Sequence, residues 1–415
     1  MRNFANLLQA LLIVNGLLAL LVSQTFGGLS GTILEAIQAF VSSFVVILAV
    51  LFIPCLGLNR NLPKRVFLPQ IFLLFWVSSG LWPLTSVFSQ FPIYIFAVAW
   101  QVLLGIIALI YIRALNHKSL FLTPEMFPSP NFRLGYFLSS GLVGLLLLPV
   151  CLMFFGFSLS HSYVDNLSGG FVRLGLDGLY MKERTYRLDD KTVRLASMIH
   201  IGNQEYYDDL AQSISPGRTL VLSEGVSDED GLLRDSFSYG GVADFLGLSA
   251  QGQMLIGGRL IGVEQLSETD FRGSENALPD IARADIDLRN FDPQTIAFIN
   301  ALGTHLLSNG SLAEGFKAFN LWAQNHVTQE TNDIIMNDLV TKRNRAVLKH
   351  LSVALSKYDT IVIPWGAMHM VGIEAAVKEQ GFLLQSDLER RSIDFSKLPI
   401  VALLGKISDT DGESL

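Results

Sequence analysis

Hydrophobic residues dominate the first 160 positions of the chain, and they fall into five long runs. The runs cover Leu7–Phe26, Leu34–Leu58, Val66–Phe88, Pro92–Ile112 and Gly135–Phe157. Each is close to the roughly 20 apolar residues that a helix needs to cross a bilayer. Pro69, Gly80 and Pro83 interrupt the third run, and the turn at 89–92 must separate it from the fourth, because one helix through both would be far too long. The pattern predicts an α-helical membrane module, residues 1–159, of about five transmembrane helices.

After residue 160 the apolar runs shorten and alternate with polar segments, which is typical of an α/β domain. Two β-rich runs flank the polar turn Asp189–Lys191 and predict a hairpin over residues 185–200. Further strands are expected at 219–222, 360–364 and 382–386, and helices at 206–214, 292–321, 337–355 and 373–379. These elements predict a domain at 160–407 with a mixed central sheet, followed by a polar tail at 408–415.

Charge divides the chain at the same place. The chain is 50% hydrophobic with a mean hydropathy of +0.41, which is too apolar for an ordinary soluble enzyme. The first 159 residues hold seven basic residues against Glu35 and Glu125, whereas the remainder carries a net charge of −12. An acidic second domain argues against nucleic acid as a partner, because phosphates need a basic surface. The lipid bilayer is the expected partner of the first domain.

The basic residues also predict an orientation, because cytoplasmic loops are enriched in Lys and Arg. Arg2 and the loops at 60–65 and 113–133 belong inside, and the uncharged segments 24–31 and 89–91 belong outside. Five crossings then give a multi-pass protein of the cytoplasmic (inner) membrane with its N-terminus inside and its second domain outside. If the first span is instead a cleaved signal peptide, four spans remain and the second domain is still outside. That domain has no cysteine, so it holds no thiol nucleophile.

Two histidine-containing strings have similar surroundings. Ser197–Gly202 contains His200 and Gly366–Gly372 contains His369, and each string follows a short β-rich run. Polar residues beside glycine at the ends of strands commonly form a site at the edge of a sheet. A single histidine among apolar neighbours is more often a packed core residue. The shared context favours one site to which both histidines contribute, as metal ligands or proton carriers.

Glu224 and Arg343 are the further candidates for this site. Glu224 ends an apolar strand, where a carboxylate is costly to bury unless it is paired or bound to a metal. Arg343 lies on a predicted helix and either faces solvent or reaches the site to stabilise a developing anion. Asp285 and Asp287 alternate along an extended run, for which a capped loop is favoured over a carboxylate pair. The chain contains no H-E-x-x-H, P-loop or G-x-S-x-G motif.

These residues, taken together, resemble the TraB/PrgY/GumN family, which includes the animal Tiki proteins. That family has an early hairpin ending in G-x-x-H, a strand ending at Glu, a helix with an R-N or R-D pair, and a late G-x-x-H. The matching positions are His200, Glu224, Arg343-Asn344, and Gly366 with His369; Ser197 stands where the family usually has Gly. The resemblance covers residues 185–390 and implies a fold akin to the erythromycin-esterase and ChaN-like group. It also implies a metal-dependent peptidase, since Tiki proteins are described as Mn- or Co-dependent proteases.

The first functional hypothesis is therefore a membrane-anchored hydrolase, peptidase-like, that acts outside the cytoplasm. Glu224, Arg343 and His369 are its catalytic candidates. His200, Glu224 and His369 are the candidate ligands of a divalent metal (Mn, Co or Zn), whose ligating atoms should lie within about 4–5 Å of one another for ~2 Å bonds. The alternative is a binding protein that sequesters a peptide, haem or metal without turnover. A transporter is disfavoured, because no Asp, Lys, Arg or His lies mid-span.

Overall fold

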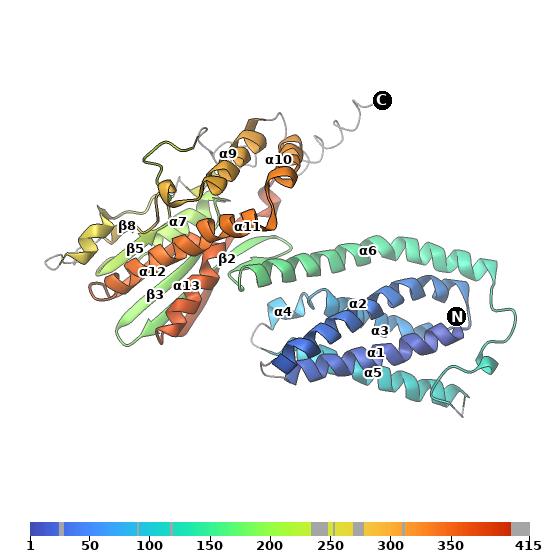
Figure 1. Cartoon of the computed structure of the whole chain (residues 1–415). Coiled ribbons are helices and arrows are strands. Elements are labelled where there is room, and N and C mark those ends of the chain that lie inside the picture. The colour runs from blue at the N-terminus through green and yellow to red at the C-terminus, as the bar shows by residue number, and fades with distance from the viewer. Residues whose placement is uncertain are drawn as a thin grey trace. The chain divides into compact units, whose positions relative to one another are not determined.

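The computed structural model describes residues 1–24, 29–88, 91–116, 119–233, 248–251, 254–268, 278–308 and 312–399 (Figure 1). The chain divides into two compact units, residues 1–163 and 164–415. The boundary predicted at 159/160 lies inside the long helix that ends the first unit. The polar tail predicted at 408–415 and the domain end predicted at 407 lie outside the described residues.

The first unit is helical. Its helices are α1 Arg2–Gln24, α2 Leu29–Leu58, α3 Lys64–Ser78, α4 Leu84–Val87, α5 Ile93–Asn116 and α6 Leu134–Leu167. Within the described residues, four helices are long and apolar enough to cross a membrane, namely α1, α2, α5 and α6. The predicted helical region is thus confirmed, with four helices that could span a membrane in place of the five predicted.

The third predicted span, Val66–Phe88, is the one that differs. It is divided into α3, of 15 residues, and the four-residue α4. The backbone between them is left-handed at Gly80 (φ +100°) and Leu81 (φ +61°), which no α-helix tolerates. A side chain at Gly80 would also lie 2.4 Å from Cβ of Ser162 on α6. Close packing against α6 therefore ends α3 early.

Small and amide side chains join the helices inside this unit. A Cβ at Gly105 of α5 would lie only 2.5 Å from Ile13 of α1, so the two helices approach closely there. The buried amides of Gln9 on α1 and Gln70 on α3 bond to each other, at 3.2 Å and 2.9 Å. Because hydrocarbon offers no hydrogen-bond partners, such pairing satisfies these groups within the protein.

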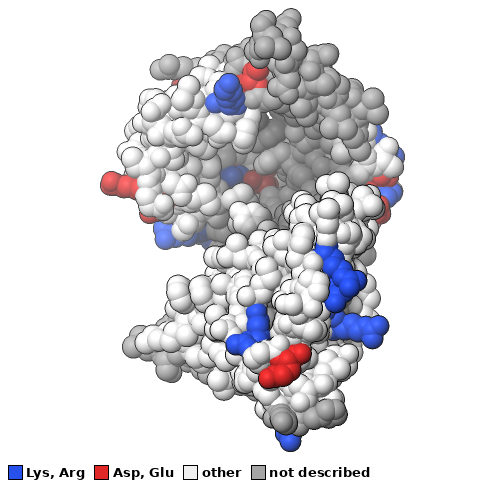
Figure 2. All heavy atoms as spheres, turned by 90° about the vertical axis from the view of Figure 1, so that its right-hand side faces the viewer, with Lys and Arg blue, Asp and Glu red and all other residues white. Residues whose placement is uncertain are grey.

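Hydrogen bonds gather the basic segments at one end of the first unit. Asn6, at the start of α1, exchanges two hydrogen bonds with Leu122 after α5. Arg60, after α2, donates its backbone N–H to Asn131 before α6 at 3.1 Å. The opposite end is formed by Trp82 and its neighbours, where the hydroxyl of Ser158 on α6 accepts the Trp82 N–H. Figure 2 faces the first of these ends and shows Lys and Arg side chains exposed on it.

The second unit is built on an eight-stranded mixed sheet within the described residues, and the predicted mixed sheet is confirmed. The main strands are β1 Val172–Leu174, β2 Gly178–Leu188, β3 Lys191–Met198, β5 Thr219–Ser223, β7 Arg259–Ile261, β8 Asp280–Arg283, β9 Thr360–Gly366 and β10 Leu383–Asp394. Their order is β1-β2-β3-β9-β5-β8-β7, with β10 also paired to β2. The hairpin β2–β3 and the pairs of β2 with β1 and β10 are antiparallel. The neighbours from β3 to β7 are parallel.

Helices cover both faces of this sheet. The helices are α7 Gln204–Gln212, α9 Pro293–Ser308, α10 Leu312–His326, α11 Gln329–Met336, α12 Arg343–Ala354 and α13 Ala367–Glu379. One face buries Leu220, Leu222 and Ile361 against α12 and α13, and the other packs Ala196 and Met198 against tyrosines of α7. A π-helix, Asn337–Lys342, joins α11 to α12 where the sequence predicted one continuous helix. The two-residue strands β4 Ile201–Gly202 and β6 Ser249–Ala250 form a separate small sheet.

Candidate functional site

The parallel strands place the predicted site residues at one edge of the sheet. Because β3, β9, β5 and β8 are parallel neighbours, their carboxyl ends meet at the same edge. Glu224 directly follows β5, Asp285 follows β8 by two residues, and His369 lies in the first turn of α13 after β9. His200 follows β3 by two residues. Four segments far apart in sequence therefore bring polar side chains to one place.

Arg343 connects the two carboxylates of this edge. Its Nε and Nη2 form a forked pair with Asp285, at 3.0 Å to Oδ1 and 2.7 Å to Oδ2. The same Nη2 lies 2.7 Å from Glu224 Oε1. Asp285 and Glu224 raise the pKa of Arg343 against the opposing effect of its burial, so it is a permanent cation. Of the two sequence alternatives, the structure therefore shows Arg343 directed into the site and not into solvent.

Backbone N–H groups hold both carboxylates in place. Glu224 Oε2 accepts the N–H of Gly366 at 2.6 Å, at the N-terminus of α13, where the helix dipole favours a negative charge. Asp285 accepts the N–H groups of Gly225 and Ile286, both at 2.9 Å. The side chains of Glu224 and Asp285 are 6% and 0% exposed. Two buried carboxylates thus share one guanidinium, which leaves the group with an excess negative charge.

His369 adds a neutral base to this group. Its Nδ1 lies 2.8 Å from Asn344 Oδ1, while Asn344 Nδ2 donates to the His369 carbonyl at 3.2 Å. Because the amide oxygen can only accept, Nδ1 carries the proton and Nε2 presents its lone pair. That Nε2 accepts a hydrogen bond from Arg343 Nη1 at 3.2 Å and lies 3.6 Å from Glu224 Oε1. Burial lowers the pKa of His369 to about 4, against the opposing charge of Glu224, so the imidazole is neutral at pH 7.

The π-helix explains how Arg343 and Asn344 reach the site together. It inserts a wider turn directly before Arg343, and π-turns of this kind recur at functional sites. Asp338 anchors the turn by accepting the N–H of Asp292 at 2.6 Å and the hydroxyl of Thr295 at 2.8 Å. On the facing helix α13, a Cβ at position 372 would lie 2.6 Å from Asn344 Nδ2. Gly372 therefore leaves the room that the Asn344 amide occupies.

The proposed metal ligands are only partly brought together. Glu224 Oε1 and His369 Nε2, 3.6 Å apart, are within the distance expected of two ligands of one ion. His200 is exposed, and its Nδ1 is 2.8 Å from Gln251 Oε1, although it is near enough for its charge to lower the pKa of His369. In the part of the chain that the structure describes, no three His, Cys, Asp or Glu side chains are grouped to hold a metal. Arg343 lies against the same carboxylate oxygen that a metal would use.

Asp285 is the site residue whose role the sequence pattern did not indicate. The alternation of Asp285 and Asp287 suggested two carboxylates facing the same way. In the structure Asp285 pairs with Arg343, whereas Asp287 caps the short helix Leu288–Asn290 and pairs with Arg289. The sequence held one indication of this role, because the strand Asp280–Arg283 ends just before Asp285. The indication could be recognised only once the strand order placed β8 next to β5.

Comparison of the chain with protein-family models, with curated proteins and with solved structures finds no match in any of the three.

Proposed function

We propose that this protein is a membrane-anchored hydrolase whose second unit cleaves an amide or ester bond. The observation that carries the proposal is the buried neutral imidazole of His369, with Nε2 next to both a fixed cation and a carboxylate. A base, an anion-stabilising cation and a carboxylate are the groups that hydrolysis of a carbonyl compound requires. Their position at the carboxyl ends of parallel strands is where α/β folds usually bind ligands.

In the proposed reaction, a water molecule attacks the substrate carbonyl and His369 Nε2 takes its proton. The Arg343 guanidinium stabilises the negative charge that develops on the carbonyl oxygen. Glu224, 3.6 Å from Nε2, stabilises the imidazolium, which then gives its proton to the leaving nitrogen or oxygen. Asn344 acts as a positioning residue, because its amide selects the tautomer with a free Nε2.

A divalent metal (Mn, Co or Zn) is the second part of the sequence hypothesis, and the residues fit it incompletely. His369 Nε2 and Glu224 Oε1 have the spacing of two ligands, and the excess negative charge of the site would favour a cation. Arg343 already occupies that oxygen, however, and the third expected ligand, His200, bonds to Gln251. We therefore assign the cationic role to Arg343 and derive no step from a metal.

The substrate class of this proposal comes from the resemblance to the TraB/PrgY/GumN family. That resemblance implies peptides, and it rests on Glu224, the Arg343-Asn344 pair, His369 and the more divergent His200. The structure adds a physical reason for the pattern, since three of these four positions are in mutual contact. A small peptide with an accessible amide bond is accordingly the first substrate to test.

The proposed orientation has the basic end of the first unit in the cytoplasm of a cell with an inner membrane, and the second unit outside. Arg2, Arg60, Lys64, Arg113 and Arg133 lie on segments that are hydrogen-bonded together at one end. Although α3 is short, the segment 64–88 contacts both ends of α6. Lys64 lies over the Tyr136 ring near the start of α6, and Trp82 donates its backbone N–H to Ser158 near the end. That path is consistent with a fifth crossing, which an outside second unit requires if the N-terminus is inside.

The test is incubation of the purified full chain with a peptide mixture, followed by mass spectrometry of the products. We expect cleaved peptides with the wild-type chain and none with His369→Ala. His326→Ala is the control, since His326 stacks on Trp322 of α10, away from this cluster. Peptides that stay intact but remain bound in stoichiometric amounts would contradict hydrolysis and favour the binding protein. Cleavage that disappears with a chelator and returns with Mn would contradict the assignment of the cationic role to Arg343 alone.

A further inference from the structure

Within the described residues, a basic loop at the end of the first unit forms no ion pair with a carboxylate. The loop, Asn59–Arg65, runs from the end of α2 into the first turn of α3 and packs against residues 128–136 before and within α6. Asn61 fixes the two segments together, since its Nδ2 donates to Asn131 Oδ1 at 2.6 Å and to the Pro128 carbonyl at 3.1 Å. The segment is therefore tied to the residues that precede α6.

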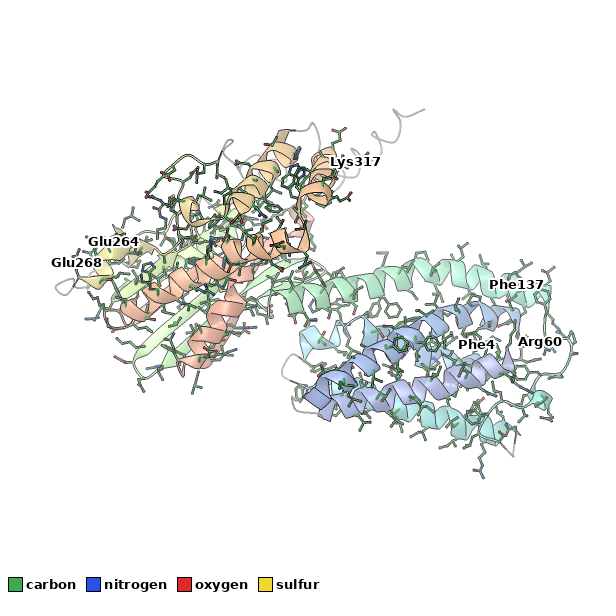
Figure 3. All side chains as sticks on the ribbon, viewed as in Figure 1. Phe4, Arg60, Phe137, Glu264, Glu268 and Lys317 are labelled. Atoms are coloured by element: carbon green, nitrogen blue, oxygen red, sulfur yellow. The ribbon has the colours of Figure 1, made fainter. Side chains whose placement is uncertain are left out.

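We propose that Arg60 and Lys64 of this loop bind the phosphate group of an anionic phospholipid. The inference is independent of the proposed hydrolase, since it concerns the first unit alone. Figure 3 labels Arg60 near Phe4 and Phe137, at the end of the unit where the apolar spans stop. In a bilayer, the ends of such spans lie at the level of the lipid headgroups.

The first observation is an unsatisfied donor on Arg60. Its Nε is buried and has no hydrogen-bond partner, although the residue as a whole is half-buried. A buried donor without an acceptor costs free energy, and native proteins rarely leave one unpaired. An arginine donates through a planar fork whose geometry matches the oxygens of a phosphate. Since the buried Nε is not open to solvent, the Arg60 side chain must shift for a phosphate to supply the acceptor that the described residues lack.

The second observation is the position of Lys64. Its ammonium is held over the Tyr136 ring, 4.4 Å from the centroid, and donates to the carbonyls of Arg60 at 3.0 Å and Leu62 at 3.3 Å. A cation fixed next to Arg60 in this way reinforces the same anion site. Among the described residues, neither Arg60, Lys64 nor the neighbouring Arg65 and Arg133 forms an ion pair with a carboxylate.

A lipid is favoured over a free phosphate because of the surroundings of the loop. The outer surface of α6 next to it is almost wholly apolar, with Leu138, Leu142 and Leu145 each more than half exposed. Acyl chains can cover such a surface, whereas a soluble phosphate cannot. Basic residues near an anionic membrane surface are attracted to its headgroups. The site thus combines a phosphate-binding pair with an apolar wall.

The experiment measures lipid binding by the full chain in detergent, by native mass spectrometry and by the shift in unfolding temperature. The probes are phosphatidylglycerol, phosphatidylcholine and inorganic phosphate. We expect phosphatidylglycerol to bind and stabilise the wild-type chain more than phosphatidylcholine does. Arg60→Gln should weaken phosphatidylglycerol binding about tenfold, or about 1.4 kcal/mol. Arg113→Gln, which removes an equal charge from the exposed last turn of α5, should weaken it less than about twofold on the same scale.

Equal losses from Arg60→Gln and Arg113→Gln would overturn the proposal, because they would indicate diffuse attraction to the basic end. Stabilisation by inorganic phosphate equal to that by phosphatidylglycerol would also overturn it. If Arg60→Gln unfolds the chain even in phosphatidylcholine, Lys64→Gln takes its place in the comparison with Arg113→Gln. A selective loss in Lys64→Gln then supports the site, and no selective loss overturns it.

Discussion

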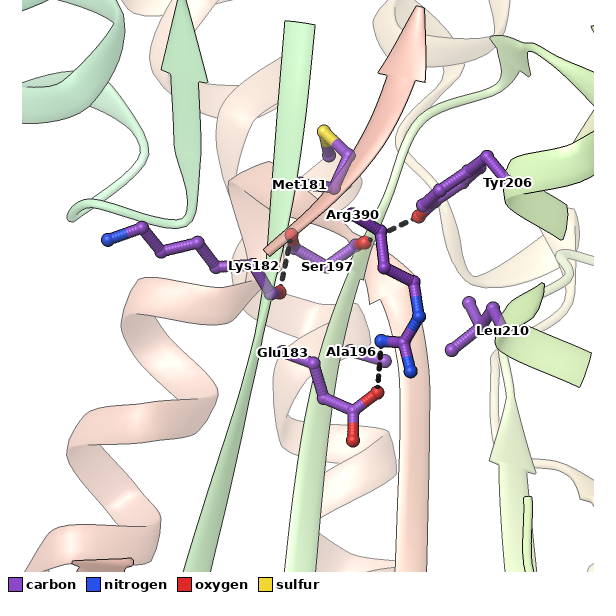
Figure 4. A pocket seen from close by; sticks show the side chains of 8 residues that line it. All are labelled: Met181, Lys182, Glu183, Ala196, Ser197, Tyr206, Leu210 and Arg390. Atoms are coloured by element: carbon purple, nitrogen blue, oxygen red, sulfur yellow. Dashed lines mark hydrogen bonds and ion pairs between the residues drawn. The ribbon is translucent and has the colours of Figure 1, made fainter. Parts of the chain in front are cut away.

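Two buried clusters of charge lie on the same sheet of the second unit, and they differ in how their charges are balanced. In the first, which we call the Glu183 cluster, one oxygen of Glu183 on β2 accepts from Arg194 at 2.7 Å. The other accepts from Arg390 at 2.6 Å, as Figure 4 shows. Arg390 also reaches Asp209, whose side chain is 66% exposed, at 2.5 Å, so a buried and an exposed carboxylate together balance two guanidinium groups. The recess around them has no volume for a water molecule.

The second, which we call the Glu224 cluster, consists of Glu224, Asp285, Arg343 and His369. Like the Glu183 cluster it has two carboxylates, but it has only one guanidinium, and its fourth member is a neutral imidazole. A balanced, closed cluster has nothing further to bind, and its groups fix the packing of strands β2, β3 and β10. An unbalanced cluster with an imidazole lone pair can accept a proton or a cation. The difference teaches that burial of charge alone does not identify a site, whereas an unmatched charge next to a base does.

The largest effect that should separate the clusters is on turnover. We predict that Glu224→Gln lowers kcat/KM for a cleaved peptide by about 10²–10⁴-fold, because general acid–base catalysis by His369 then loses the carboxylate that stabilises its imidazolium. The amide has the shape of the carboxylate, and Arg343 keeps its forked pair with Asp285. The amide nitrogen, however, replaces an oxygen that accepts from Gly366 or Arg343, so the folded fraction is measured as well. The measurement is kcat/KM at equal folded fraction. An equal loss of turnover in Glu183→Gln would remove the functional distinction between the clusters.

The next effect is on the free energy of unfolding, and it should be large for the Glu183 cluster, which is not expected to affect turnover. Glu183→Ala leaves Arg194 and Arg390 without their shared carboxylate, and loss of one partner of a buried pair costs about 3–5 kcal/mol. We expect the free energy of unfolding to fall by that amount, as measured in urea by tryptophan fluorescence, to which the buried Trp365 of this unit contributes. The matched control is Glu389→Ala, whose partly exposed pair with Arg173 should contribute less than about 1 kcal/mol. Similar losses from both variants would show that the Glu183 cluster is not a special structural element.

The sequence predicted much of this fold because its strongest signals are local. The spans at α1, α2, α5 and α6 and the hairpin β2–β3 follow directly from apolar runs and a polar turn. The end of α3 was predicted wrongly, because it depends on the contact of Gly80 with α6 and not on hydropathy. Local pattern also missed the π-helix before Arg343, since its wider turn leaves the apolar spacing of the helix nearly unchanged.

The candidate site was predictable to the extent that strand ends mark it. Glu224 and His369 were identified because each follows a buried strand next to glycine. Asp285 was not, because its partner is 58 positions away and becomes adjacent only through the order β9-β5-β8. His200 shares the strand-end pattern of His369 but hydrogen-bonds to Gln251. Its role as a ligand stays a prediction.

Acid should affect the two clusters in different pH ranges. The native pKa of His369 is lowered by burial to about 4, from 6.5 in an unfolded chain. Between these values the unfolded state binds more protons, so the free energy of unfolding falls as pH falls, by up to about 3 kcal/mol. The pKa of Glu183 is also low, since Arg194 and Arg390 outweigh the opposing effect of burial. Its contribution is lost only below the ordinary glutamate pKa of 4.5.

Urea titrations of the wild-type chain and His369→Gln between pH 7 and 4.5 separate these contributions. We expect the wild-type chain to lose stability through this range and the variant to lose clearly less. Glu183→Gln, by contrast, should keep the wild-type slope above pH 4.5. Parallel curves for the wild-type chain and His369→Gln would show that the imidazole is not held neutral by its surroundings.

The smallest effect concerns the room left for Asn344 and probes how the Glu224 cluster is held in position. Gly372→Ala places a methyl group 2.6 Å from the present position of Asn344 Nδ2, so the amide must shift. In a helix interior, alanine is otherwise favoured over glycine by about 0.8–1 kcal/mol, so stability should change little. We expect kcat/KM to fall about tenfold, or about 1.4 kcal/mol, because the amide no longer fixes the His369 tautomer.

Asn344→Ala removes the same acceptor directly, and it should have an equal or larger effect. If both substitutions act through the His369 tautomer, adding Gly372→Ala to Asn344→Ala should cause no further loss, and the double-mutant cycle should be strongly non-additive. Additive losses would instead mean that Gly372 matters for the packing of α13 alone. The Glu183 cluster contains no histidine whose tautomer must be selected. A positioning residue such as Asn344 is therefore expected only in the Glu224 cluster. The size of its coupling to His369 shows how strongly that cluster is arranged for catalysis and not only for folding.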